Sequence, residues 1–401
     1  MGGGTAATAA EVLAATDATK YVSPLTLNQY QGKVPNCDDS SIDSGGLAWS
    51  AFIKIYNNST NGGEAFSNPV ISTFSVIYTS AVNPAFAGGC LDANGTMHMS
   101  CSCAPVGQKV DRYGTISTYS LVYTNGNYAY LGGVLNAAGD LHFCPHYLAT
   151  RGQKIDRNGV VSTYSLVYTT AWLHYGGVLA RNGDIHFVPS CAAVGQKVNV
   201  AGTVSTYSLA FTQGHTGADY YGTYWGGVLS PTGEIHFIPH DAPVGQKLDI
   251  NGNPSTYSLA YTTRQAYNGG VLAPDGSIHF IPKYASVGQK IDINGNVSTY
   301  PYAFTTDWAC GGGILAPNGD IHFIPTFMYA MGQKIARNGT VSTYSVPWTA
   351  QGNCLGGVLN ERADALLVPY AAGAVFAGRM SFLSGLTSGR GVVCSSWINK
   401  F

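Results

Sequence analysis

Charged side chains are scarce in this chain. Only 10% of its residues are Asp, Glu, Lys or Arg, and the formal net charge is −1. We therefore expect no basic surface that would attract nucleic acid or an anionic membrane. No apolar run has the length of a membrane-spanning helix, and residues 1–21 lack the charged start and apolar centre of a secretory signal. The chain is predicted neither to bind nucleic acid nor to insert into a membrane.

Recognisable catalytic motifs are also missing. The sequence contains no G-x-S-x-G, no phosphate-binding loop, no H-E-x-x-H and no sialidase-type S-x-D-x-G-x-x-W repeat. A glycosidase-type carboxylate pair would have to come from a few acidic residues, and no spacing distinguishes any two of them: Asp219, Asp241, Asp307 and Glu361. From the sequence alone we expect a protein that is not an enzyme and that carries no cofactor.

The cysteines form no metal-binding pattern. There are 9 of them at irregular spacing, and Cys101-Ser102-Cys103 is too close for a zinc-type C-x-x-C pair. Reduced structural thiols in a protein folded in a cytosol are the expected state. A single disulfide remains an alternative.

What the sequence does contain is an internal repeat. A Gly-Gly pair recurs about every 44 residues, the blade period of a β-propeller and too long for most helical solenoids. The pair begins at Gly88, Gly132, Gly176, Gly226, Gly269, Gly312 and Gly356. A Gly-Gln-Lys element begins at Gly107, Gly152, Gly195, Gly245, Gly288 and Gly332. A Ser-Thr-aromatic element begins at Ser72, Ser117, Ser162, Ser205, Ser255, Ser298 and Ser342.

Each repeat contains four strand-like pieces. In the third repeat they read GGVLA, DIHFVP, GQKVNV and TVSTYSLAFT, and Gly-containing turns join the first piece to the second and the third to the fourth. A single four-stranded sheet is marginal in water, so the copies are expected to stack against one another. The Gly-Gly piece suits the crowded innermost strand, and the aromatic, β-branched piece suits the outermost strand.

The two ends of the chain together complete one repeat. The segment 71–79 is a fourth strand that precedes the first Gly-Gly pair, and the last repeat, from Gly356, lacks a fourth strand. Pairing of 71–79 with 374–382 would close a ring and remove exposed sheet edges. The sequence therefore predicts an all-β protein whose residues 70–401 form a seven-bladed β-propeller with four-stranded blades. An open solenoid or a two-sheet β-sandwich is the alternative. The repeat also resembles the kelch-like propellers encoded by phages and some bacteria.

Two residue types recur in the blades and invite a functional interpretation. A histidine occupies the same place in six repeats: His98, His142, His186, His236, His279 and His322. Equivalent positions in neighbouring blades lie too far apart to share one metal ion, so we interpret these imidazoles as packing groups that hydrogen-bond to the next blade. The six lysines of Gly-Gln-Lys are interpreted likewise, as strand-end groups with carboxylate or carbonyl partners. The D-x-N-G pieces at Asp156, Asp249 and Asp292 are predicted to be turns and not calcium loops.

The crossovers between blades vary within the chain and are the expected functional surface. They share one face with the loops between second and third strands, and loops on a rigid scaffold commonly carry function. The longest crossover, 213–225, is the first choice. Aromatic rings beside polar groups suit stacking on sugars or contact with a protein. The candidate ligand-binding residues are Trp172, His174, Tyr175, His215, Asp219, Tyr220, Tyr221, Tyr224, Trp225 and Trp308. Packing of these rings over the axis or between blades is the competing explanation.

The N-terminal segment 1–35 carries a specific motif, A-x-T-D-x-T-K-Y-V-S-P-L-T-L. It resembles a short segment widespread in bacteriophage tail-fibre, head-fibre and related virion proteins, near their junction with the particle. The residues that carry the match, and that the resemblance implies for virion attachment, are Thr16, Asp17, Thr19, Lys20, Tyr21, Val22, Pro24 and Leu25. The resemblance implies a structural virion protein, assembled in the host cytoplasm as a homotrimer. Residues 36–69 are predicted to be a transition segment.

These observations lead to one functional hypothesis and two alternatives. The hypothesis is a phage fibre or spike protein that is attached to other virion proteins by its N-terminus and contacts a host-surface glycan or receptor with its propeller. The first alternative is a capsid head decoration or cement protein. The second is a propeller enzyme that acts on a polysaccharide.

Overall fold

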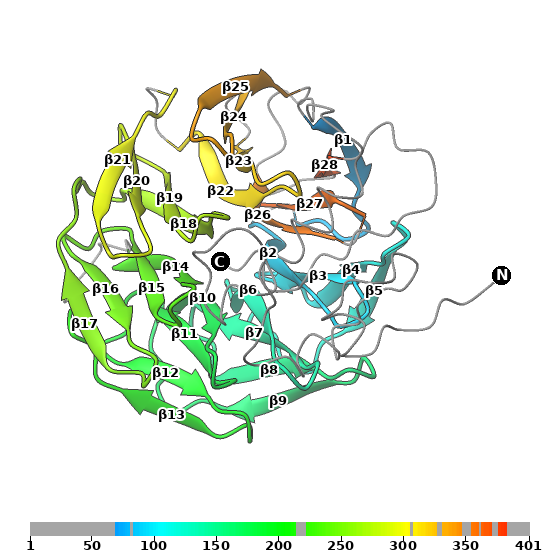
Figure 1. Cartoon of the computed structure of the whole chain (residues 1–401). Coiled ribbons are helices and arrows are strands. Elements are labelled where there is room, and N and C mark those ends of the chain that lie inside the picture. The colour runs from blue at the N-terminus through cyan, green and yellow to red at the C-terminus, as the bar shows by residue number, and fades with distance from the viewer. Residues whose placement is uncertain are drawn as a thin grey trace, which may run out of the picture. The chain divides into compact units, whose positions relative to one another are not determined.

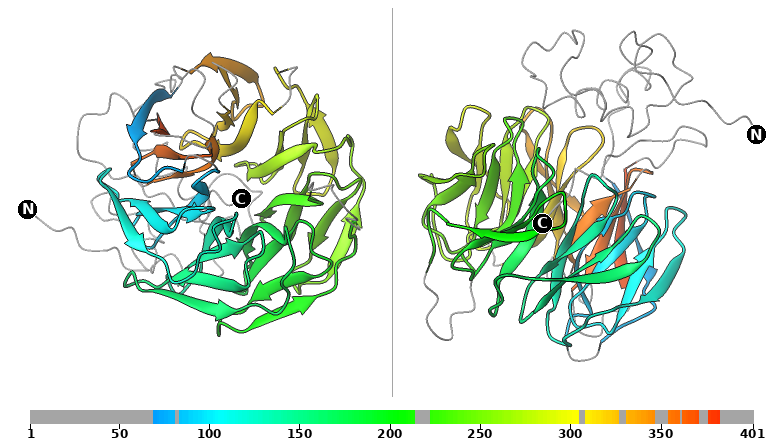
Figure 2. Two further views of the ribbon diagram at one scale, coloured as in Figure 1. Left: turned by 180° about the vertical axis from the view of Figure 1, so that it is seen from behind. Right: turned by 90° about the horizontal axis from the view of Figure 1, so that it is seen from below.

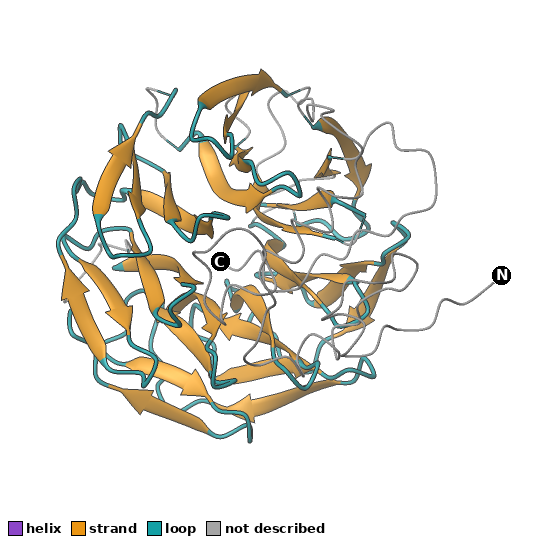
Figure 3. Cartoon of the chain, in the orientation of Figure 1, coloured by secondary structure: helices purple, strands orange, loops and turns teal. Residues whose placement is uncertain are grey.

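The computed structural model describes residues 69–80, 83–213, 222–304, 308–326, 331–346, 354–360, 362–370 and 376–382. The chain divides into two compact units, 1–63 and 64–401, and all of the described residues belong to the second. The predicted attachment segment and nearly all of the transition segment therefore lie outside the described residues. Regular structure within the described part is entirely β (Figure 3).

The strands form seven antiparallel four-stranded sheets. Each sheet is a blade, and the blades surround a central axis (Figures 1 and 2). The innermost strands are β2 (Phe86–Leu91), β6 (Tyr130–Leu135), β10 (His174–Leu179), β14 (Tyr224–Leu229), β18 (Tyr267–Leu272), β22 (Cys310–Leu315) and β26 (Cys354–Leu359). The second strands are β3 (Met97–Cys101), β7 (Leu141–Pro145), β11 (Ile185–Pro189), β15 (Ile235–Pro239), β19 (Ile278–Pro282), β23 (Ile321–Pro325) and β27 (Asp364–Pro369).

The outer strands follow in the same order. The third strands are β4 (Val106–Val110), β8 (Arg151–Ile155), β12 (Gly195–Val198), β16 (Gly245–Leu248), β20 (Gly288–Ile291), β24 (Met331–Ile335) and β28 (Phe376–Ser381). The outermost strands are β5 (Ile116–Ser120), β9 (Val161–Ser165), β13 (Val204–Tyr207), β17 (Pro254–Tyr257), β21 (Val297–Tyr300), β25 (Val341–Ser345) and β1 (Val70–Ser75). We number the blades 1 to 6 from β2 to β22, and call the blade of β26 the closing blade.

The closing blade confirms the predicted ring closure. Its strand order is β1-β28-β27-β26, so the first strand of the propeller is the outermost strand of the last blade. β1 and β28 are antiparallel in a continuous register from Val70 opposite Ser381 to Ser75 opposite Phe376. The seven-bladed prediction is therefore confirmed, and an open solenoid or a two-sheet sandwich is excluded.

The interior of each blade depends on the second strand, which is buried along its whole length in all seven blades. Its phenylalanine is fully buried in blade 4, where Phe237 packs against Tyr224 at the start of the innermost strand. Burial of such a ring contributes roughly 1.5–3 kcal/mol. On the axial side the glycines are needed for space, because a Cβ on Gly88 would lie 3.1 Å from the backbone of Gly132 in the next blade.

The Gly-Gln-Lys element makes contacts both within its own blade and with the preceding blade. In blade 3, a Cβ on Gly195 would lie 2.1 Å from the ring of Tyr207, so only glycine leaves room for that tyrosine. The side chain of Gln196 is fully buried, and its Oε1 accepts hydrogen bonds from the backbone N–H groups of Val167 and Tyr168, which lie after the outermost strand of the preceding blade. The glutamine therefore holds the exit of one blade against the next.

Four of the six lysines of this element pair with acidic residues of their own blade, in the turn between first and second strands. The pairs are Lys154–Asp140 at 2.5 Å, Lys197–Asp184 and Lys247–Glu234 at 2.7 Å, and Lys334–Asp320 at 3.5 Å. The carboxylate partners predicted for these lysines are therefore present. Since the lysines remain partly exposed, each pair is worth at most about 1 kcal/mol.

The recurring histidines are packing groups, but their partners differ from the prediction. The ring of His142 lies 5.5 Å from the ring of Tyr164, and its Nδ1 is 3.2 Å from the tyrosine oxygen. Tyr164 belongs to the same blade and not to the next one. Its ring occupies the space left by the glycine of Gly-Gln-Lys, which brings it next to His142. Burial lowers the pKa of His142 to about 4, so this imidazole is neutral at physiological pH.

The D-x-N-G pieces are turns, as predicted. Oδ1 of Asp249 accepts hydrogen bonds from the backbone N–H groups of Asn251 and Asn253, which closes the hairpin between the third and fourth strands of blade 4. Asp292 does the same in blade 5. Among the described residues, no group of three or more His, Cys, Asp or Glu side chains could hold a metal ion.

Candidate functional site

One position of the repeat faces the axis on the side of the crossovers and changes from blade to blade. It is the residue directly after the second strand. In chain order it is occupied by Ser102, His146, Ser190, His240, Lys283, Thr326 and Tyr370. The residue before it is proline in six of the seven blades, whereas this position and the one after it change from blade to blade, so the repeat is broken here.

A continuous series of backbone hydrogen bonds holds these variable residues in place. The N–H of Ala266 in one crossover donates to the carbonyl of His240 in blade 4, and the N–H of Lys283 donates to the carbonyl of Ala266. The N–H of Trp308 then donates to the carbonyl of Lys283. The same alternation links blades 1 to 4. Each variable side chain is therefore presented from a rigid backbone that two blades share.

Blades 4 and 5 contribute a buried amine to this series. Nζ of Lys283 lies 4.0 Å from the ring centre of Trp225 and 5.1 Å from that of Trp308. It donates a hydrogen bond of 2.8 Å to Oε1 of Gln265 and lies 3.2 Å from Nε2 of His240. The residue is only 4% exposed. We call Trp225, His240, Gln265, Lys283 and Trp308 the lysine site.

The geometry defines the protonation of His240. Its Nδ1 lies 3.1 Å from the carbonyl oxygen of Gly222 and therefore carries a proton, which leaves Nε2 to accept a hydrogen bond from Lys283. The imidazole is fully buried and is stacked on Trp225, with the two rings 3.8 Å apart and 12° from parallel. Amine and imidazole thus form a pair that can pass a proton between them.

Two opposing effects act on the amine. Burial lowers the pKa of Lys283 to about 7, and the carboxylate of Asp241 works against this shift. The indole faces of Trp225 and Trp308 also favour the ammonium form. Asp241 itself accepts a hydrogen bond of 2.6 Å from the backbone N–H of Gln265. Lys283 is therefore a group that can take up or release a proton near neutral pH, as a general base or acid requires.

The crossovers hold part of this site in an unfavourable backbone conformation. Gln265 and Trp308 have φ of 53° and 55°, in the left-handed region that residues other than glycine rarely adopt. Both lie two residues before an innermost strand. Tyr128 and Trp172 occupy the same repeat position and have φ of 49° and 56°. Strain of this kind costs on the order of 1–3 kcal/mol per residue and concentrates at functional sites.

The structure separates the candidates that the sequence suggested. Trp225 and Trp308 belong to the lysine site, and Tyr175 lies beneath it, stacked on Trp225 at 4.0 Å. His174 and Tyr224 are fully buried and pack against the phenylalanines of their own blades. Their aromatic character reflects blade packing. The other candidates in the long crossover lie outside the described residues: His215, Asp219, Tyr220 and Tyr221.

Sequence reasoning missed Lys283, His240 and Gln265. Lys283 and His240 directly follow the proline that ends the second strand, and the change of residue type at this position from blade to blade is a signal that the sequence offers. Asp241 is one of the acidic residues that could have supplied a glycosidase pair. It is instead a structural acceptor for the backbone of Gln265 and lies beside Arg264, whose Nε is 3.8 Å from Oδ2.

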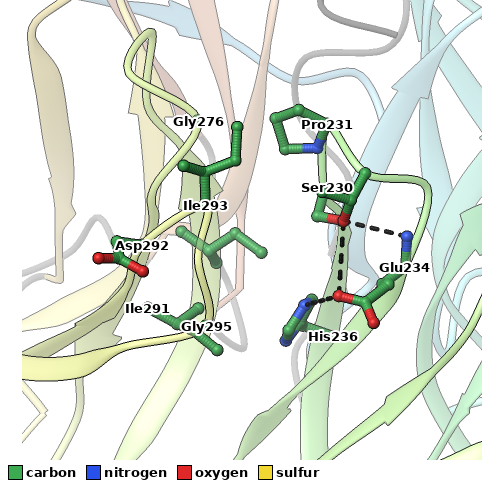
Figure 4. A pocket seen from close by; sticks show the side chains of 11 residues that line it. Ser230, Pro231, Glu234, His236, Gly276, Ile291, Asp292, Ile293 and Gly295 are labelled. Atoms are coloured by element: carbon green, nitrogen blue, oxygen red, sulfur yellow. Dashed lines mark hydrogen bonds and ion pairs between the residues drawn. The ribbon is translucent and has the colours of Figure 1, made fainter. Parts of the chain in front are cut away.

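A small pocket lies on the opposite face, between blades 4 and 5 (Figure 4). Ser230, Pro231 and Glu234 line one side, and Gly276 and Ile293 line the other. Its volume of about 20 Å³ has room for a water molecule or two. The described part of the chain also contains no helix long and apolar enough to cross a membrane.

No protein-family model and no curated protein sequence matches this chain. Solved structures share its fold. A streptogramin B lyase has a TM-score of 0.65 and 17% identity, over 80% of this chain and 99% of the lyase. Virginiamycin B lyase from Staphylococcus aureus has a TM-score of 0.64 and 14% identity, over 78% of this chain and 99% of that chain. A catalytically inactive variant of it, with histidine replaced by alanine and with quinupristin, gives 0.62.

These neighbours correct one expectation. The absence of catalytic motifs predicts a chain that is not an enzyme. The solved structures that share its fold contradict this prediction. The similar propellers are lyases, and their alignments with this chain cover about four fifths of it. At 14–17% identity the similarity establishes the fold, and the fold is one that carries catalysis. The missing motifs therefore do not exclude catalysis.

Proposed function

We propose that the lysine site is the reaction centre of a propeller lyase that acts on a uronic-acid polysaccharide of a cell surface. The observation that carries the proposal is the environment of Lys283. Its amine lies between two indole rings and is hydrogen-bonded by an amide oxygen and an imidazole nitrogen. No carboxylate among the described residues forms an ion pair with it. Such an amine can be uncharged at neutral pH and can remove a proton.

The proposed reaction is a β-elimination. The uncharged amine of Lys283 takes the proton from the carbon next to the uronate carboxyl group, and its electrons form a carbon–carbon double bond. The glycosidic C–O bond one carbon further breaks, and the Lys283 ammonium returns the proton to the departing oxygen. His240 accepts a hydrogen bond from Lys283 and keeps its Nζ in place. General acid–base catalysis of this kind contributes about 10²–10⁴-fold to a rate.

Three further observations support this choice. Trp225 and Trp308 present large rings beside the amine, and sugar rings stack on such surfaces. The neighbours that share the fold are named as lyases, and one became inactive when a single histidine was replaced. Arg264 has a side chain that is 59% exposed near Asp241, where a cation can meet the carboxylates of the polymer.

The test is an assay of polygalacturonate, alginate, hyaluronan and chondroitin with the purified full chain. Elimination leaves an unsaturated sugar, detected by ultraviolet absorbance and by the mass of the product. We expect product from at least one polymer, and a loss of about 10²–10⁴-fold for Lys283→Met. Lys290→Met is the matched control, because this repeat lysine lies on β20, away from the site, and we expect it to keep the activity.

The proposal fails if none of the four polymers yields an unsaturated product, or if Lys283→Met is as active as Lys290→Met. Saturated products would show hydrolysis in place of elimination and would also overturn it. Circular dichroism and the melting temperature of both variants establish that any loss of activity does not arise from unfolding.

A second role is supported by a different observation, the motif at Thr16–Leu25 and its resemblance to phage virion proteins. We propose that the chain is a phage fibre or spike component, a homotrimer attached to other virion proteins by this segment, whose propeller contacts a host glycan or receptor. Immunogold electron microscopy of the particle tests the location. Labelling at the tail supports the role, labelling over the capsid supports head decoration, and unlabelled particles contradict both. Light scattering of the purified chain tests the trimer.

A further inference from the structure

A second group of aromatic rings lies on the same face and takes no part in the proposed reaction. It consists of Tyr128, Tyr147 and Trp172, which we call the Trp172 cluster. The ring centres of Tyr147 and Trp172 are 4.5 Å apart, and those of Tyr128 and Trp172 are 6.0 Å apart. All three side chains are half-buried, so each keeps part of its ring in contact with solvent. The cluster joins the crossovers and loops of blades 1 to 3.

The backbone of this cluster is held under strain. Tyr128 and Trp172 both have left-handed φ values, as Gln265 and Trp308 do at the same repeat position. A glycine adopts such angles at no steric cost, whereas a bulky residue pays on the order of 1–3 kcal/mol. Backbone hydrogen bonds hold this conformation, from the N–H of Tyr147 to the carbonyl of Tyr128 and from the N–H of Cys191 to the carbonyl of Trp172. The two strained residues of this cluster both carry large rings.

The rings are accompanied by amide groups. Nδ2 of Asn125 donates a hydrogen bond of 2.7 Å to the carbonyl of Tyr147, and its Oδ1 accepts one of 2.9 Å from the N–H of Asn127. The hydroxyl of Tyr128 lies 3.5 Å from Oδ1 of Asn83. None of these residues carries a charged side chain. An uncharged surface of rings and amides suits the apolar face and the hydroxyl groups of a sugar.

Buried rings connect the cluster with the lysine site. His146, in the variable series, lies 5.2 Å from Trp172 and 5.5 Å from Tyr175. Tyr175 stacks on Trp225, which lies against Lys283. The two surface groups are therefore parts of one packed assembly across blades 1 to 6, and their relative position is defined by rigid contacts.

We propose that the Trp172 cluster is a sugar-binding subsite remote from the reaction centre, so that the protein binds a polysaccharide across several sugar units. Trp172 and Tyr147 stack on one part of the polymer while the bond to be broken lies at Lys283. This rests on the proposed function for the identity of the ligand as a uronic-acid polymer. The stacking energy of the remote units improves binding of long chains and leaves the chemistry of short ones unchanged.

The experiment compares size-fractionated oligomers of the polymer that is cleaved fastest. Trp172→Ala should raise KM about tenfold for long oligomers, which corresponds to roughly 1.4 kcal/mol of lost binding. It should leave kcat, and KM for the shortest cleaved oligomer, within about twofold of the parent protein, since remote binding adds nothing to the chemistry of short chains. Trp308→Ala is the matched control, because its ring lies at the reaction centre and its loss should affect all lengths. Trp172→Phe, which keeps a ring, should restore most of the binding.

A binding measurement separates this inference from the proposed reaction. Calorimetry of Lys283→Met with long oligogalacturonate, with and without Trp172→Ala, reports on the subsite without catalysis. Loss of lyase activity in every variant, with length-dependent binding intact, would remove the reaction and keep the subsite. Equal effects of Trp172→Ala on short and long oligomers, or no effect on either, would overturn the subsite. So would Trp172-dependent binding to host cells whose polysaccharide has been removed enzymatically, since the partner would then be a protein.

Discussion

Two histidines of blade 4 lie four residues apart and behave in opposite ways. His236 sits within β15, has counterparts in five other blades, packs against Tyr257, and has a pKa lowered by burial to about 4. His240 follows the strand, has a counterpart only at His146, and hydrogen-bonds to the amine of Lys283. The difference shows that repetition marks the residues that build a blade. The residues of the proposed reaction centre appear where the repeat is broken.

The first prediction compares substitutions of these two histidines. His240→Phe keeps a ring to stack on Trp225 but removes the acceptor for Lys283, so we expect the lyase rate to fall by about 10²-fold while folding is retained. His236→Ala removes a packing group, so we expect a lower melting temperature and an unchanged kcat for the folded protein. Steady-state kinetics and thermal unfolding measure both. The comparison breaks if His236→Ala lowers kcat as much as His240→Phe.

The second prediction concerns a constant glycine. Gly195→Ala places a methyl group against the ring of Tyr207, so the tyrosine must move or the strand must shift. Overpacking of this kind should reduce the free energy of unfolding by roughly 1–3 kcal/mol. Denaturant unfolding measures the effect. Activity per folded molecule should not change, and a change would mean that the outer strands influence the lysine site.

The third prediction uses the pKa of Lys283. Its value in the folded protein, about 7, is below its ordinary value of 10.5, so the unfolded chain binds more protons between these two pH values. The free energy of unfolding should therefore rise from about pH 7 to about pH 9, by on the order of 1–2 kcal/mol. The lyase rate should rise over roughly pH 6–8 as the amine loses its proton. Lys283→Met should flatten the stability profile, and the Lys290→Met profile should match the parent.

The smallest effect on stability is expected for Gln265→Gly. Glycine relieves the left-handed backbone strain but gains flexibility in the unfolded chain, so stability should change by less than about 1 kcal/mol. The loss of the hydrogen bond to Nζ of Lys283 should still reduce the lyase rate, by roughly tenfold. Gln289→Ala provides the contrast, because its Oε1 binds Ala260 and Tyr261 across the blade junction and its loss should affect stability alone.

The fold could be predicted because the sequence motifs that form each blade are repeated along the chain. Gly-Gly, Gly-Gln-Lys and Ser-Thr-aromatic each occur at a regular interval, and the unmatched pieces at the two ends of the chain are sufficient to predict ring closure. The partners of the repeated histidines could not be predicted in the same way. His142 contacts Tyr164 within its own blade because a glycine opposite leaves space for the ring, and such a space is not visible in a pattern.

The site was predicted less well, for a physical reason. Aromatic character in a crossover does not distinguish a ring that packs inward, such as Tyr224, from one that lies against Lys283, such as Trp225, although the two are adjacent. Alternation along β14 decides between them. Lys283 has no catalytic motif around it, because motifs depend on spacing along the chain and its partners come from separate segments. Only the stacking of blades brings them together.

The register of β1 against β28 has a consequence for how the protein is made. A ribosome produces β1 before the six intervening blades and β28 after them, so β1 remains unpaired while six whole blades are translated. During that interval its hydrogen-bonding edge and that of the growing array are open to other chains. Slow expression or a chaperone that covers the nascent chain should therefore favour the intact molecule over aggregates.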